Sequence, residues 1–102
     1  MPPVSVYQAL ALALQHHQAG RLGEAEALYH RMLAVQPGHS EALHHLGVIA
    51  HQTGHHALAV EWIRRAVAVA PLNPAAHSNL GEAYRALGRL DEAILSFHRA
   101  CH

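Results

Sequence analysis

Residues 77–100 read HSNLGEAYRALGRLDEAILSFHRA, and this stretch decides the fold. Its apolar residues recur at spacings of three and four, which is the period of an α-helix. Gly88 interrupts the pattern at a position where a left-handed helix C-cap suits glycine, so the stretch predicts two helices joined by a tight turn. No segment of the chain alternates polar and apolar residues as a strand does. The chain is therefore predicted to be all-α.

The same pattern occurs three times at a spacing of 34 residues. The columns that agree are Gly20, Gly54 and Gly88; Leu12, Leu46 and Leu80; Ala25, Ala59 and Ala93; Tyr29, Ile63 and Phe97; and Met32, Ala66 and Ala100. One helix pair cannot bury its apolar faces alone, so neighbouring pairs must stack. We predict one domain over residues 1–102, with repeats at about 6–39, 40–73 and 74–102, built as a solenoid of six antiparallel helices.

The helix boundaries follow from the same columns. The first helices of the repeats are predicted at residues 6–19, 40–53 and 74–87, and the second helices at 23–36, 57–70 and 91 to the chain end. Ser40 is predicted to cap its helix with its side chain. Asn73 is a second predicted cap, because Pro74 suits the first position of a helix.

The composition excludes several classes of function. The 102 residues are 51% hydrophobic and 14% charged, and the formal net charge is zero. All basic residues other than histidine are arginines, and the neutral chain lacks the field that attracts phosphates, so we expect no nucleic-acid or membrane partner. Cys101 is alone and cannot form an internal disulfide. Without a nucleophile elbow or a glycine-rich phosphate loop, we expect no enzyme activity and no cofactor. A cytoplasmic location is expected, and the Ala- and Arg-rich composition favours a bacterial source.

The three copies resemble the tetratricopeptide repeat (TPR) family, whose pattern runs from a large residue through Leu-Gly, an aromatic residue and Ala to a second aromatic residue, Ala and Pro. The third copy carries His77, Leu80, Gly81, Tyr84, Ala93, Phe97 and Ala100 at these positions. The second carries Leu43, Leu46, Gly47, Ala50, Ala59, Ile63, Ala66 and Pro71, and the first is the most divergent. The resemblance covers about residues 6–102 and implies an α-α superhelix.

In TPR arrays the first helices line a concave groove that holds a peptide or a helix of a partner. The groove residues that the resemblance implies here are Leu10, Leu14, His17, His44, His45, Val48, His51, Asn79, Glu82 and Arg85. Such a groove is apolar at one end, rich in histidine in the middle and polar at the other end. The resemblance therefore implies a non-catalytic scaffold with a protein or peptide partner.

Two binding modes within the family need different residues. A clamp for a terminal carboxylate uses Lys, Asn and Arg, but this chain has no Lys and only Arg85 could bind a carboxylate. An asparagine ladder occurs in arrays attached to O-GlcNAc transferases, and residues 78–84, SNLGEAY, resemble one rung through Asn79. Two alternatives stay open: Asn79 binds a client backbone, as in the substrate-recognition segment of a bacterial O-GlcNAc-transferase-like enzyme, or it bonds to its own turn.

The twelve histidines do not have the spacing of a metal site. The adjacent pairs, such as His44 and His45, are expected to point in different directions on a helix. His98 and His102 are spaced by four, so they are the candidates for adventitious Zn²⁺ or Ni²⁺, and no built metal site is expected. Most histidines are predicted to be generic polar residues. Below about pH 6 unperturbed imidazoles gain charge, which predicts higher solubility and weaker self-association in acid.

The sequence stops at His102, at about the end of the last predicted helix, with no polar capping helix after it. An uncapped stack exposes its last face, and an exposed apolar patch marks an association surface. The residues predicted to mediate self-association are Leu87, Leu90, Ile94, Phe97 and Cys101. Two hypotheses are compatible here: the chain is a piece of a longer protein, or it forms a homo-oligomer.

Overall fold

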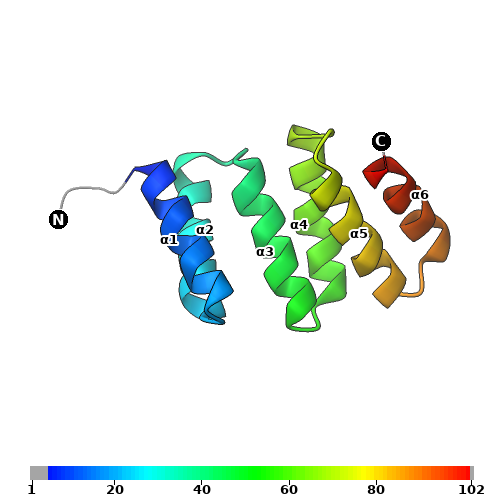
Figure 1. The fold of residues 1–102 in the computed structure, drawn as a ribbon, viewed down its shortest axis with the longest axis horizontal. Helices are drawn as coiled ribbons and strands as arrows, with labels where there is room; N and C mark the ends of the chain where they lie inside the picture. Colours follow the sequence, from blue (N-terminus) through cyan, green and yellow to red (C-terminus); the bar gives the residue numbers. More distant parts are fainter. Residues whose placement is uncertain (1–4, 102) are drawn as a thin grey trace.

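The computed structural model describes residues 5–101, which form helices α1 (Val6–Gln18), α2 (Leu22–Val35), α3 (Ser40–Gln52), α4 (His56–Val69), α5 (Pro74–Ala86) and α6 (Leu90–Ala100). No strand occurs within residues 5–101. Figure 1 shows the helix pairs following one another along the long axis from α1 to α6, and the molecule measures 48 × 25 × 19 Å. The predictions of an all-α solenoid and of three helix pairs are confirmed.

The helices pack mainly with their neighbours along the chain. The largest contacts join α1 to α2, α3 to α4 and α5 to α6, and α2 with α3 and α4 with α5 connect these pairs. Two apolar clusters result, one centred on the first two repeats and one on the last two. There is thus no single central core, and each repeat is stabilised by the next one.

Close helix packing depends on residues without a large side chain. A Cβ at Gly47 would lie 2.3 Å from Cγ1 of Ile63, and a Cβ at Gly81 would lie 2.7 Å from Cε1 of Phe97. Glycine at these two positions therefore lets the second helix of each pair place its large side chain directly against the first helix.

The three turns inside the repeats are built alike. Gly20, Gly54 and Gly88 have φ of 80°, 84° and 74°, the left-handed region that glycine adopts without strain. After each glycine, the next backbone N–H donates to a carbonyl five residues back, as in Arg89 to Tyr84 at 2.9 Å. This is the Schellman arrangement, so the predicted glycine caps are confirmed.

The helix starts agree with the sequence at one site and differ at another. Asn73 Oδ1 accepts hydrogen bonds from the N–H groups of Ala75 and Ala76, as predicted for a cap before Pro74. The predicted cap Ser40 is wrong, because Ser40 is already the first helical residue. The cap is His39, whose Nδ1 accepts from Ala42 N–H at 3.2 Å. A neutral imidazole nitrogen is an acceptor and can replace a hydroxyl oxygen at this position.

One repeat column does not share a common environment. Leu46 and Leu80 are buried, but Leu12 in the same column is 42% exposed. A residue at this position packs against the preceding repeat, and within residues 5–101 no helix precedes α1. Equal positions in a solenoid are therefore not equally buried at its ends.

Candidate functional site

Polar side chains of the three first helices meet along one face of the stack. His17 Nε2 on α1 donates to Gln52 Oε1 on α3 at 2.9 Å. Asn79 Nδ2 on α5 donates to His44 Nε2 on α3 at 2.8 Å. Each bond joins residues 35 positions apart, so both connect corresponding parts of successive helices. We call this face, with the ten residues predicted for it, the candidate groove.

Four rings in contact, His17, Tyr29, His44 and His45, form the centre of the candidate groove, and we call them the imidazole cluster. His45 stacks on the fully buried Tyr29 with ring centroids 5.4 Å apart and planes 12° apart. His44 in turn stacks on His45, with ring centroids 5.2 Å apart. His17 meets His45 edge-on at 5.7 Å, and its Nδ1 accepts a long hydrogen bond of 3.5 Å from the Tyr29 hydroxyl. The cluster joins α1, α2 and α3.

Burial sets the charge state of these rings. Removal from water, together with repulsion from His44 and His17, lowers the pKa of His45 to about 4. Burial also lowers the pKa of His44, with Glu41 acting in the opposite direction. The pKa of Tyr29 is raised to about 12, mainly by burial. At neutral pH the rings of Tyr29, His44 and His45 are therefore uncharged.

One expectation about the histidines was wrong. His44 and His45 were expected to point in different directions, but their rings are stacked with planes 23° apart. His44, one of the predicted groove residues, is only 7% exposed. Side-chain torsions let neighbouring residues on a helix bring their rings against each other, which the sequence pattern does not reveal.

Of the two contacts proposed for Asn79 from sequence, the bond to its own turn is absent, and binding of a client backbone stays a prediction. Its Nδ2 donates across the repeats to His44, so it does not bond to its own turn. Among the described residues, Oδ1 of Asn79 has no hydrogen-bond partner. One half of the amide is thus held by α3 and the other half remains an acceptor on the candidate groove.

The other predicted groove residues differ in how they are presented. Leu10, Leu14 and Val48 are half-buried on α1 and α3. At the opposite end, Glu82 and Arg85 form an ion pair with each other on α5. An exposed pair of this kind contributes little to stability, and Arg85 already has a carboxylate partner.

His51 lies at the end of α3, where its ring contacts the first residue of α4 instead of another repeat. Nδ1 of His51 and Nδ1 of His56 are 2.9 Å apart. One nitrogen donates and the other accepts, so this pair needs at least one neutral ring. Within residues 5–101, no three His, Cys, Asp or Glu side chains are placed to hold a metal ion together. The candidate pair His98 and His102 cannot be assessed, because His102 lies outside the described residues.

The comparison with family models decides the classification. The model described as tetratricopeptide repeat matches residues 10–74 and 63–102, which is nearly the whole chain. This chain belongs to the tetratricopeptide repeat family. The TPR resemblance seen in the sequence is thereby confirmed, and the TPR module itself is a repeat and not a catalytic domain.

Among known TPR proteins, human tetratricopeptide repeat protein 7B is 38% identical over 72 residues, which are 68% of this chain and 8% of that protein. The structure is similar to a Thermobaculum terrenum O-GlcNAc transferase mutant, with a TM-score of 0.91 and 35% identity, over 93% of this chain and 18% of that one. It is also similar to MamA, with a TM-score of 0.86 and 24% identity, over 95% and 57% of the two chains. This TPR chain thus spans only part of the length of these proteins.

A third similar structure is the second TPR domain of Spaghetti (RPAP3), bound to the HSP90 peptide SRMEEVD. Its TM-score is 0.89 at 17% identity, over 94% of this chain and 89% of that one. At this identity the likeness concerns the TPR fold alone. In the part of the chain that the structure describes, no helix is both long and apolar enough to span a bilayer.

The last helix pair of the TPR array carries exposed apolar side chains. Leu90 and Ile94 are 59% and 65% exposed, and Leu87 and Cys101 are also exposed. Phe97, predicted for the same patch, is half-buried because its ring packs over Gly81. We call Leu87, Leu90, Ile94 and Cys101 the end patch.

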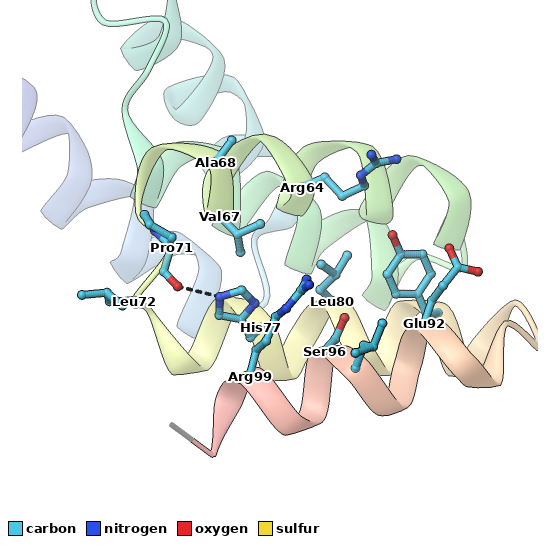
Figure 2. Close-up of a pocket in the computed structure, with 12 residues that line it drawn as sticks. Arg64, Val67, Ala68, Pro71, Leu72, His77, Leu80, Glu92, Ser96 and Arg99 are labelled. Carbon is cyan, nitrogen blue, oxygen red and sulfur yellow. Dashed lines mark hydrogen bonds between the residues drawn. The ribbon is translucent and has the colours of Figure 1, made fainter.

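A pocket in the last two repeats was not predicted from the sequence. It has a volume of about 660 Å³ and lies between α4 and α6, with α5 as its floor (Figure 2). Arg64 and Arg99 stand on its two sides, and Ser96 lies in its α6 wall. The signal in the sequence is the 34-residue column that holds Trp62 in the second repeat and Ser96 in the third.

Proposed function

We propose that this TPR domain is a non-catalytic scaffold whose candidate groove binds a peptide or a helix of a protein partner. The observation that carries the proposal is the row of polar side chains from Gln52 and His17, through the imidazole cluster, to Asn79. The row crosses all three first helices. A ligand that follows it must be elongated, which suits a peptide chain better than a compact metabolite.

The chemistry of the row supports a peptide backbone as the ligand. Backbone amides offer N–H donors and C=O acceptors in alternation. Oδ1 of Asn79 is an available acceptor, and the buried ring of His44 and the half-buried ring of His45 are neutral and add no charge to the groove. Leu14 and Val48 supply apolar contacts beside it. The TPR domain of Spaghetti in complex with an HSP90 peptide supports peptides as a ligand class for this fold.

The alternative is a substrate-recognition segment of an O-GlcNAc-transferase-like enzyme. Two observations favour it: the 35% identity to the Thermobaculum terrenum enzyme and the position of Asn79 on the candidate groove. In that case the chain is one part of a longer protein whose catalytic domain lies elsewhere. The nucleotide sequence downstream of the codon for His102 distinguishes the two, because it encodes either a glycosyltransferase domain or none.

Self-association through the end patch is a further part of the proposal. Leu90 and Ile94 would each remove apolar area from water in a dimer, which favours association. We expect sedimentation velocity to show a concentration-dependent oligomer, and Ile94→Glu to give a monomer at the same concentrations. A wild-type monomer at tens of micromolar would contradict it. The cytoplasmic location and the bacterial source stay predictions of the sequence.

The groove is tested with a random peptide library displayed on phage and selected on the wild-type domain. We expect the selected peptides to lose at least about tenfold in affinity when Asn79→Ala is combined with Val48→Arg. Glu61→Gln on α4 is the matched control, because Glu61 is exposed and lies away from the candidate groove. Peptides that bind the double variant as tightly as the wild type would contradict groove binding.

A further inference from the structure

The pocket between α4 and α6 has an occupied counterpart one repeat earlier. A shift of 34 residues takes Trp62 to Ser96, His30 to Arg64 and Arg65 to Arg99. At the earlier position Trp62 fills the space between α2 and α4, where it packs against both apolar clusters. The pocket therefore corresponds, one repeat later, to the space that the Trp62 indole fills. Ser96 has only a small hydroxymethyl group at the equivalent position.

The surroundings of Trp62 indicate what the empty counterpart can hold. The indole meets the His30 ring edge-on at 5.7 Å between centroids. On another side the Arg65 guanidinium carbon lies 5.0 Å from the ring centroid, within range of a cation–π contact. Arg99 and Arg64 stand at the corresponding places of the pocket without such a ring between them (Figure 2).

The walls of the pocket are mostly apolar and its rim is positive. Val67, Leu80 and Leu95 line it, and the His77 ring is held at its base by a 2.7 Å hydrogen bond from Nε2 to the Pro71 carbonyl oxygen. A volume of about 660 Å³ is in the usual range for a pocket that binds a ligand group.

Charge adds a second requirement to this shape. Arg64 and Arg99 form no ion pair within residues 5–101, whereas Glu92, the acidic residue of the lining, is paired with Arg89. The rim thus has two cations that lack a carboxylate and one carboxylate that already has a cation. A ligand with negative charge beside its apolar group would complement it.

We propose that this pocket is a second binding site of the domain, for an aromatic side chain of a protein partner that is flanked by acidic residues. The ring occupies the place that an indole takes at Trp62, with the Arg99 guanidinium against its face. The flanking carboxylates pair with Arg64 and Arg99. The site is separate from the candidate groove and extends the domain's function to two partners or to two segments of one partner.

The probe is the blocked tripeptide Asp-Trp-Asp, titrated into the ¹⁵N-labelled chain and followed by NMR. We expect saturable shifts of the amide signals of Leu95, Ser96 and Ala68, with little change at Asn79 in the candidate groove. Asp-Ala-Asp is expected to bind about tenfold more weakly, because it lacks the ring. Lys-Trp-Lys should also bind more weakly, by about threefold to tenfold, because its charges are repelled.

Two variants locate the contact. Ser96→Trp fills the pocket as in the second repeat and should abolish binding. Leu95→Glu is the second variant. Leu95 is 54% exposed, so its replacement is expected to leave the fold intact and to weaken binding by at least about fivefold. Arg31→Gln is the matched control, since Arg31 is the exposed counterpart of Arg99 in the first repeat.

Three results would overturn the proposal. Equal binding of the Trp and Ala peptides would remove the aromatic requirement, and shifts centred on Asn79 would place the peptide in the candidate groove. A dimer that dissociates in Leu95→Glu, but not in Ile94→Glu, would show that a second copy of this chain occupies the pocket. Because the probe acts outside the groove, failure here leaves the proposed groove function standing, and the reverse also holds.

Discussion

Acid is expected to destabilise this protein through His45. Burial lowers its pKa to about 4 in the folded chain, against about 6.5 in the unfolded chain. At pH 7 the ring is neutral in both states and has no effect. As the pH falls below 6.5, the unfolded chain takes up a proton that the folded chain does not, so the free energy of unfolding decreases until about pH 4.

The size of the effect follows from the pKa difference. At about 1.4 kcal/mol per pH unit, His45 alone removes about 2 kcal/mol of stability at pH 5 and about 3 kcal/mol in full below pH 4. His44 acts in the same direction, because burial lowers its pKa as well. This is a large share of the stability of a domain of ordinary size. The predicted gain in solubility in acid is therefore accompanied by a loss of folding stability.

The measurement is urea unfolding at pH 7, 6 and 5, followed by Trp62 fluorescence and circular dichroism. His45→Phe keeps a ring on Tyr29 but cannot titrate, so between pH 7 and 5 it should lose about 2 kcal/mol less than the wild type. His55→Gln, at an exposed position, is the control and should follow the wild type. If wild type and His45→Phe lose equal stability in acid, burial of His45 does not set the pH dependence.

Three further substitutions test the packing and the caps by urea unfolding at pH 7. Gly47→Ala should lower the free energy of unfolding by about 2 kcal/mol, because the added Cβ would lie 2.3 Å from Cγ1 of Ile63. Gly38→Ala is the control and should cost far less, because no atom lies nearer than 4.0 Å to its added Cβ. Equal costs would refute the close approach. Asn73→Ala should cost about 1 kcal/mol through loss of two capping bonds, and an unchanged midpoint would contradict this. His77→Leu should raise the free energy of unfolding by about 1 kcal/mol, since Nδ1 of His77 is buried without a partner among the described residues. A large loss would show that the hydrogen bond from His77 Nε2 to the Pro71 carbonyl contributes more than the unpaired Nδ1 costs.

The sequence predicted the arrangement of helices well because each local signal occurs in three copies. Helix period, glycine at the turns and small residues at the contacts recur every 34 positions, so a local signal that is weak once becomes decisive. The cap at Ser40 was wrong by one residue, because histidine is not read as a cap although a neutral imidazole nitrogen accepts a hydrogen bond equally well.

The candidate site was less predictable, since it depends on how side chains turn and what they meet. The residues of the candidate groove came from the TPR resemblance, but the stacking of His45 on Tyr29 depends on contact between α3 and α2. The pocket between α4 and α6 depends on a difference between repeats, Ser96 where the second repeat has Trp62, and a search for agreement between copies passes over it.

By itself, the sequence determined that this chain is an open stack of three helix pairs. Apolar periodicity and glycine placement set the local backbone conformation, and both recur in each repeat. Only the tertiary structure decided the state of the histidines. The pKa of His45 depends on how much water and which rings surround it, and those neighbours come from α1 and α2. Burial and contact between repeats are properties of the assembled stack, so the same residue type is a helix cap at His39 and a neutral ring in the imidazole cluster at His45.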